Sequence, residues 1–265
     1  MKKNQRTRII QSLSNFAVEA SKLYSDHPMD YKGRPVTPQG VLGTGNDSNN
    51  IDVIEAILNT TKGKRILDIG IAYGIYAVVL QRLFSFEIDG IDHPENIESY
   101  CRYPIQEGIK VKACDLHVDK IPYEDSAFDA VIASEVVEHL LISSEAFFSK
   151  IYPKLKPGGK LIVTTPNFSS LRNIVQILRG INPSGHFSDE VLDNESKLFD
   201  SRVHPREYTV KEICLSLRES GFNIIKIKTK LNSSPGKERL RAKLLNLLMT
   251  MIPHYSEKII TIGTK

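Results

Sequence analysis

From residue 51 onward the chain alternates between short apolar runs of strand length and segments whose apolar residues recur with a helical period. The runs predict five strands: Arg65–Ile69, Phe86–Ile91, Lys110–Ala113, Phe128–Ala133 and Lys160–Thr165. The segments between and before them predict helices at Ile51–Leu58, Ile75–Leu83, Pro94–Arg102 and Ser144–Leu155. Alternation of this kind predicts a parallel sheet with helices on both faces.

The C-terminal part departs from this simple winding. A helix is predicted at Val210–Ser220, followed by strands at Asn223–Lys230 and Lys258–Gly263. Between these strands, Lys237–Met251 predicts a basic amphipathic helix. We expect its leucines to pack on the sheet, and contact with a membrane surface is the alternative.

Two regions lie outside the repeating pattern. Residues 1–50 are predicted to form an N-terminal extension, with a helix over residues 6–24 and a loop rich in Pro, Gly, Asn, Thr and Ser over residues 28–50. Residues 51–265 then form the main domain. Within it, residues 168–203 carry scattered Gly and Pro and few β-branched runs, which indicates an insertion that covers a pocket.

Composition narrows the functional classes. The chain has 265 residues, of which 41% are hydrophobic and 25% are charged, and this composition is typical of a globular protein. Its net charge of +4 is too small to indicate nucleic-acid binding. Three cysteines lie far apart without disulfide or zinc spacing, so a reducing, cytoplasmic location is expected. No segment approaches the ~20 apolar residues that span a bilayer.

The most informative motif is the sequence Ile-Leu-Asp-Ile-Gly-Ile-Ala-Tyr-Gly at residues 66–74. An apolar strand ends at Asp68, and Gly70 and Gly74 bracket a tight turn into the next helix. Small residues let the backbone come close to a ligand, and the first N–H groups of the helix favour a polar or anionic group.

Polar residues also follow each predicted strand of the parallel sheet. They are Asp68, Asp92, Asp115, Glu135 and Asn167. In open α/β sheets, ligands bind beyond the carboxyl ends of the strands, so these side chains are expected to share one site. Asp92 lies 24 positions after Asp68, where an acidic residue can accept both hydroxyls of a ribose.

Together these motifs resemble the class I S-adenosylmethionine-dependent methyltransferases that act on small molecules in bacteria. The resemblance runs from about residue 63 to 222 and includes the final strand. It rests on the following motifs in this order: Asp68-x-Gly70-x-Ala72-x-Gly74, Asp92, Cys114-Asp115-Leu116, Phe128-Asp129-Ala130-Val131, Glu135-Val136-Val137-Glu138-His139-Leu140, Lys156-Pro157-Gly158-Gly159 and His204-Pro205-Arg206-Glu207-Tyr208-Thr209.

The resemblance implies a doubly wound, seven-stranded, mostly parallel Rossmann-like sheet whose last strand is antiparallel. It also implies the cofactor S-adenosyl-L-methionine. It assigns cofactor binding to Asp68, Gly70, Ala72, Gly74, Asp92, Asp115, Leu116 and Glu135. In this assignment Asp68 orients the turn and the amino-acid part of the cofactor, and Asp92 holds the ribose. Asp115 contacts the adenine amino group beside the Leu116 backbone, and Glu135 lies under the methionine end.

One position departs from the family pattern, which usually has glycine where this chain has Ala72. We expect a slightly shifted turn in which Ala72 keeps a negative φ.

Methyl transfer requires alignment of an acceptor, exclusion of water and, for a hydroxyl acceptor, removal of a proton. His139 and His204 are the candidate bases, since imidazole titrates near neutral pH. The alternative is that both are structural. In the insertion, His186 and Phe187 are candidates for contact with the acceptor. Arg206 and Tyr208 could position it, although packing is the simpler interpretation.

The predicted function is therefore methyl transfer to an oxygen or nitrogen of a small molecule, such as a sugar, glycan or lipid-linked precursor. No metal ligand is assigned. Glu135, Glu138, His139 and His204 also resemble the metal-ligand set of small-RNA 2′-O-methyltransferases, which makes metal-dependent RNA methylation an alternative. A second alternative is a regulatory protein that binds the cofactor without catalysing a reaction. A nicotinamide-dependent dehydrogenase is disfavoured by the spacing of the glycines.

Overall fold

The structure is a computed structural model, and it describes residues 3–24, 48–183, 204–230 and 255–265. Seven strands form one sheet in the order β3-β2-β1-β4-β5-β7-β6. The strands are β1 (Arg65–Ile69), β2 (Glu87–Asp92), β3 (Lys110–Ala113), β4 (Phe128–Ser134), β5 (Leu155–Pro166), β6 (Asn223–Lys230) and β7 (Lys258–Thr264).

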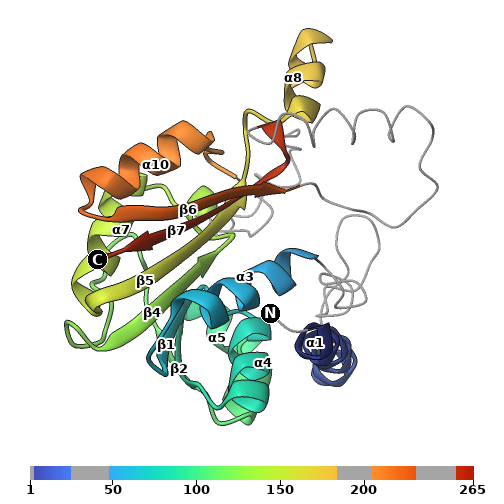
Figure 1. The fold of residues 1–265 in the computed structure, drawn as a ribbon, viewed down its shortest axis with the longest axis vertical. Coiled ribbons are helices and arrows are strands. Elements are labelled where there is room, and N and C mark those ends of the chain that lie inside the picture. The colour runs from blue at the N-terminus through green and yellow to red at the C-terminus, as the bar shows by residue number, and fades with distance from the viewer. Residues whose placement is uncertain (1–2, 25–47, 184–203, 231–254) are drawn as a thin grey trace.

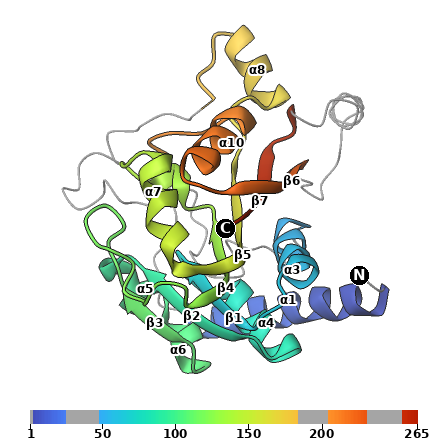
Figure 2. The same cartoon turned by 60° about the vertical axis from the view of Figure 1, so that its left-hand side comes forward.

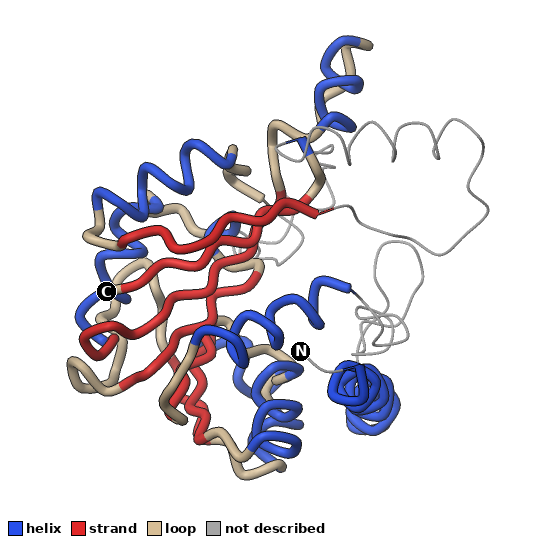
Figure 3. Tube along the Cα trace, viewed as in Figure 1, coloured by secondary structure: helices blue, strands red, loops and turns tan. Residues whose placement is uncertain are grey.

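Neighbouring strands from β3 to β5 pair in parallel, and β7 pairs antiparallel with both β5 and β6. The predicted mostly parallel sheet with an antiparallel last strand is confirmed. Because β1 lies between β2 and β4 and pairs in parallel with both, the carboxyl ends of these three strands meet at one edge. Figure 3 shows the strands as one layer with helices on either side.

Helices cover both faces of the sheet, as Figures 1 and 2 show. The helix α3 and the helix α4 lie on one face, and α7 and α10 lie on the other. The helices are α1 (Lys3–Leu23), α3 (Ser48–Thr60), α4 (Ile75–Phe84), α5 (Pro94–Tyr100), α6 (Arg102–Gln106), α7 (Ser144–Ile151), α8 (Leu171–Leu178) and α10 (Val210–Glu219), with short 3₁₀ turns η1 (Val137–His139) and η2 (Tyr152–Lys154).

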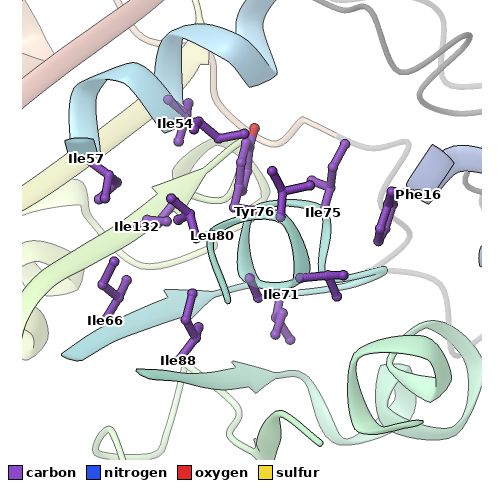
Figure 4. Packing of buried hydrophobic residues seen from close by; sticks show 14 of the residues in the cluster. Phe16, Ile54, Ile57, Ile66, Ile71, Ile75, Tyr76, Leu80, Ile88 and Ile132 are labelled. Atoms are coloured by element: carbon purple, nitrogen blue, oxygen red, sulfur yellow. The ribbon is translucent and has the colours of Figure 1, made fainter. Parts of the chain in front are cut away.

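The period-two pattern of the strands divides the core into two layers. Ile66 and Ile132 face α3 and α4, as Figure 4 shows, while their neighbours Leu67 and Val131 pack on the opposite face. All four side chains are fully buried. Each such burial contributes roughly 1.5–3 kcal/mol, so both layers are needed to hold the sheet.

The N-terminal helix α1 shares this core. Ile9, Leu13 and Phe16 lie one turn apart and are completely buried. The Phe16 ring meets the Tyr103 ring edge-on, with 5.4 Å between centroids. The predicted extension is thus packed against the main domain through α1, and the division of the chain at residue 50 stays a prediction.

The predicted helix Pro94–Arg102 is wrong in one respect, because the chain forms two helices, α5 and α6, that meet at Cys101. A continuous helix would need an N–H at residue 104 to bond the Tyr100 carbonyl, and Pro104 has none. The Tyr24 hydroxyl instead donates to that carbonyl at 2.6 Å.

The predicted helix Ser144–Leu155 is too long, and the following strand begins earlier than predicted. The α-helix ends at Ile151 because Pro153 cannot continue it, and β5 begins at Leu155. The Lys156–Gly159 segment precedes the predicted strand Lys160–Thr165. It lies within β5 at a shift of register against β4, and Gly158 N–H donates to the Lys265 carbonyl at 3.0 Å.

Parts of three predictions lie outside the described residues. These are the loop over residues 28–47, most of the insertion including His186 and Phe187, and the helix Lys237–Met251. The described part of the insertion contains α8, a helix that was not predicted. None of the described helices is both long and apolar enough to cross a membrane.

The packing of α1 yields a stability prediction. We expect Phe16→Ala to lower the free energy of unfolding by about 3–5 kcal/mol, because it empties a fully buried ring position. Val18→Ala on the same helix is the control, since Val18 is 50% exposed and should change stability by less than about 0.5 kcal/mol. Urea denaturation of both variants measures the difference, and equal effects would show that α1 is not part of the core.

Candidate functional site

A cleft opens at the carboxyl ends of the central strands. Its walls come from the turn after β1, the end of β2, the residues after β3 and the segment after β4. It is lined by Gly70, Ala72, Ile91, Asp92, His93, Asn96, Cys114, Leu116, His117, Glu135, Val136, His139 and Leu140. The structure therefore brings together most of the residues that the sequence assigned to a cofactor site.

The turn after β1 contributes Gly70 and Ala72 to the cleft and has left-handed backbone at three alternate positions. Gly70, Ala72 and Gly74 have φ values of 67°, 43° and 76°. The expectation that Ala72 keeps a negative φ is wrong. Its N–H donates to Oδ2 of Asp92 at 2.7 Å, and this bond to a buried carboxylate holds the alanine in a conformation that usually requires glycine.

Asp92 connects three parts of the cleft. Besides the Ala72 N–H, it accepts hydrogen bonds through Oδ1 from the His93 N–H at 2.8 Å and the Asn96 amide at 2.7 Å. Burial raises the pKa of this carboxyl although all three hydrogen bonds act to lower it. A carboxylate has about four lone-pair sites, so Oδ2 keeps room for one further donor, such as a hydroxyl.

Asp68 lies behind the turn and is almost fully buried. Its Oδ2 accepts no hydrogen bond from the described residues, which is unusual for a buried polar atom. Burial, with a smaller contribution from the nearby Asp92, raises the pKa of Asp68 well above its usual value. A donor or a positive charge placed here would stabilise the ionised form.

Asp115 lies next to the cleft, between the lining residues Cys114 and Leu116, and its carboxylate is already engaged. Oδ1 accepts hydrogen bonds from the His117 N–H and from His117 Nδ1, both at 2.9 Å. Since His117 Nε2 accepts from the Leu141 N–H at 3.1 Å, the ring proton must be on Nδ1. Burial acts to raise the pKa of Asp115, but the bonds from His117 outweigh it and hold the pKa low.

Asp115 does not line the cleft, whereas Leu116 and His117 do. The sequence identified Asp115 and missed His117, which carries no motif of its own. The predicted role of Asp115 at an adenine amino group stays a prediction.

Glu135 is fixed at the centre of the cleft by neighbours that sequence reasoning missed. It has a left-handed φ of 55°. Thr164 donates to its Oε1 at 2.8 Å, and Lys258 donates to its Oε2 at 3.0 Å. Lys258 begins β7, and only the antiparallel pairing of that strand with β5 brings the ammonium group to the carboxyl ends of the parallel strands.

His139 and His204, the candidate bases, lie side by side although 65 positions separate them in the sequence. Their rings meet edge-on with 4.8 Å between centroids. His139 also lines the cleft, and the fully buried Glu138 lies beside the pair. Burial, together with the negative charge of Glu135, raises the pKa of Glu138 well above its usual value.

The three cysteines are buried and unpaired, as expected. Burial raises the pKa of Cys101 and Cys214, and it raises that of Cys114 to about 11. None of the three is therefore a thiolate nucleophile at neutral pH.

Comparison with known proteins agrees with this geometry. The sequence pattern of the methyltransferase-domain family matches residues 46–227. The chain is 33% identical over 162 residues to the mitochondrial ubiquinone biosynthesis O-methyltransferase of Rattus norvegicus, covering 57% of this chain and 46% of that protein. It is 29% identical over 125 residues to phosphoethanolamine N-methyltransferase 2 of Caenorhabditis elegans, covering 46% and 28%. The matched region is thus less than half of either relative.

Solved structures share the fold at low identity. Phosphoethanolamine N-methyltransferase 2 of Haemonchus contortus, in complex with S-adenosyl-L-methionine, superposes with a TM-score of 0.53 at 18% identity, covering 83% of this chain and 53% of that one. A putative sarcosine dimethylglycine methyltransferase from Galdieria sulphuraria gives 0.55 at 14% identity, covering 95% and 98%. The fold defines an α/β protein with a Rossmann-like, mostly parallel sheet and a cleft at its carboxyl edge. The chain belongs to the methyltransferase-domain family.

The left-handed Ala72 leads to a prediction about stability. Ala72→Gly should raise the free energy of unfolding by about 0.5–1 kcal/mol. The substitution relieves about 1–2 kcal/mol of backbone strain, and this exceeds the cost of the extra conformational entropy that glycine gives the unfolded chain. Gly108→Ala is the reverse control, since Gly108 has a φ of 82° and nothing within 4 Å of an added Cβ. It should lower stability by a similar amount. Thermal denaturation compares the two, and destabilisation by Ala72→Gly would contradict the assignment.

The buried Asp68 gives a prediction about pH. Its pKa is higher in the folded than in the unfolded protein, so the folded state binds more protons and stability falls as the pH rises from the unfolded value of 3.8 towards the folded pKa. We expect Asp68→Asn to raise the free energy of unfolding of the cofactor-free protein by roughly 1 kcal/mol or more at pH 8. The gain should shrink towards pH 4. Urea denaturation across this range checks it, and a gain that is independent of pH would refute the account.

Proposed function

We propose that the protein is an enzyme that transfers a methyl group from S-adenosylmethionine to an oxygen or nitrogen of a small molecule. The observation that carries the proposal is the cleft at the carboxyl ends of the parallel strands. It combines a left-handed small-residue turn with carboxylates at the ends of β1, β2 and β4. Carboxylates suit a ligand that presents hydroxyl donors at one end and positive charge at the other.

The residues fit this cofactor because two buried carboxylate oxygens can still accept hydrogen bonds. Oδ2 of Asp68 lacks a partner, and Oδ2 of Asp92 retains capacity for one donor. We assign Asp92 to the ribose hydroxyls, and because His93 and Asn96 already donate to Oδ1, Oδ2 is the oxygen with room for a hydroxyl donor. We assign Asp68 to the amino-acid end, and Leu116 and Asp115 to the adenine.

Bound S-adenosylmethionine would supply an electrophilic methyl group on a positively charged sulfur. The chain's own contribution is to align the acceptor and to exclude water. Glu135 is held by Thr164 and Lys258, so its carboxylate is oriented before any ligand enters. His139 lines the cleft and His204 lies against its ring, and both remain our candidates for handling the acceptor's proton.

A small-molecule acceptor is better supported than RNA. The relatives described above are named for ubiquinone biosynthesis and for phosphoethanolamine, and the net charge of this chain is only +4. Three buried, unpaired cysteines support a reducing location such as the cytoplasm. A methylation assay with labelled cofactor on extracts of the source cell, followed by mass spectrometry of the product, would identify the acceptor.

The assignment of Asp92 is tested by calorimetry. Asp92→Asn keeps the shape of the side chain and removes its charge, so we expect the dissociation constant for S-adenosylmethionine to rise about 10–100-fold, which corresponds to a charged hydrogen bond of about 1.5–3 kcal/mol. The matched control is Asp125→Asn, since Asp125 is an exposed carboxylate paired with Lys154 and remote from the cleft. Unchanged affinity in Asp92→Asn would show that the ribose assignment is wrong. No binding to the unaltered protein would refute the proposed function itself.

A further inference from the structure

One ion pair at the edge of the cleft joins two strands that are far apart in the sequence. Nζ of Lys258 donates to Oε2 of Glu135 at 3.0 Å. Lys258 begins β7, whereas Glu135 follows β4. The Lys258 side chain is 17% exposed and that of Glu135 is 33% exposed, so water screens their charges only in part. An ion pair in such a place sets the electrostatic potential that a neighbouring ligand experiences.

The carboxylate of this pair is held in one orientation. The Glu135 N–H donates to the Thr164 carbonyl at 2.9 Å, and Thr164 Oγ1 donates to Oε1 of Glu135 at 2.8 Å. The Ser134 hydroxyl lies 2.7 Å from Thr164 Oγ1 and must donate to it, because the single hydroxyl proton of Thr164 is already given to Glu135. A carboxylate has about four lone-pair sites, so both oxygens of Glu135 keep room for a ligand.

The pair presents its negative end to the cleft. Glu135 lines the cleft, and Lys258 is not among the lining residues. A charged group in the cleft therefore meets the carboxylate first and the ammonium group behind it. Because contributions of opposite sign subtract, the potential at this point is negative but weaker than that of a carboxylate alone.

The order of the strands indicates which part of the cofactor lies here, and this step rests on the proposed function. The adenine is assigned to residues that follow β3, and the ribose to Asp92 at the end of β2. The strands β1 and β4 come next in the sheet. The sulfur of S-adenosylmethionine is attached to the far side of the ribose from the adenine, so it extends towards Glu135.

We propose that Lys258 sets how strongly the cleft distinguishes the positively charged sulfur of S-adenosylmethionine from the uncharged sulfur of S-adenosylhomocysteine, the product of methyl transfer. Glu135 favours the charged sulfur, and Lys258 limits this preference. In the reaction the acceptor gives its proton to the base and forms a bond to the methyl carbon, while the carbon–sulfur bond breaks and leaves its electron pair on sulfur. The charge on sulfur is thereby lost, so a carboxylate without its lysine would stabilise the starting state more than the transition state.

The test is isothermal titration calorimetry of the full chain with S-adenosylmethionine and, separately, with S-adenosylhomocysteine. The two ligands differ by one methyl group and one positive charge, so the ratio of their dissociation constants cancels the contacts that they share. Lys258→Met should shift this ratio about 3–20-fold in favour of S-adenosylmethionine. Glu135→Gln should shift it by a similar factor in the opposite direction. The double variant removes both charges and should lie between the two.

Two further variants separate the effect of charge from that of packing. Lys258→Arg keeps the positive charge, so it should retain the ratio of the unaltered protein. Lys154→Met is the matched control, because Lys154 is similarly buried and pairs with Asp125 at 2.8 Å. Lys154 precedes β5 and therefore lies at the opposite edge of the sheet from Glu135. Its replacement should leave the ratio unchanged.

Two results would overturn the inference. One is an unchanged ratio in Lys258→Met, and the other is a shift in the same direction in Lys258→Met and Glu135→Gln. Lys258→Gln takes the place of Lys258→Met if circular dichroism shows that the methionine variant does not fold. Failure of both ligands to bind the unaltered protein would refute the proposed function and this inference with it. Binding of both ligands with a ratio that does not respond to Lys258 would refute the inference alone.

Discussion

The hydrogen bond between the Ala72 N–H and the Asp92 carboxylate is the interaction on which the cleft depends. It joins the turn after β1 to the end of β2, and the same carboxylate holds the start of α5 through His93 and Asn96. Because one buried side chain fixes three backbone segments, the floor of the cleft is formed before any ligand arrives. The cost is a strained alanine and a buried charge, as is common at functional sites.

The carboxylates in and beside the cleft differ in how far their charges are balanced by neighbouring groups. Glu135 is neutralised by Lys258 and Asp115 is supported by His117. Asp68 and Glu138 are buried, and each keeps an oxygen without a partner. A buried polar group without a hydrogen bond costs about 1–3 kcal/mol, so a donor or cation that reached either oxygen would be stabilised there.

The sequence predicted the strands well because their signal is local. Arg65–Ile69, Lys110–Ala113 and Asn223–Lys230 match the structure at both ends. Two helix ends were mispredicted because a single proline, Pro104 or Pro153, interrupts a helical pattern. The φ of Ala72 was mispredicted because the side chain of Asp92, distant in the sequence, holds its backbone N–H. Lys258 and His117 were missed because no motif marks them. Their roles follow from the pairing of β7 with β5 and from the folding of the loop near Leu141, which are tertiary contacts.

The segment from Glu135 to Leu140 connects the two halves of the candidate site. Glu135, Val136 and Leu140 face the cofactor cleft, and Glu138 belongs to the buried cluster with His204, while His139 belongs to both. The turn is short, and both of its glutamates are anchored to the end of β5, Glu135 by Thr164 and Glu138 by Thr165. The same few residues at the end of β4 therefore shape both parts of the candidate site.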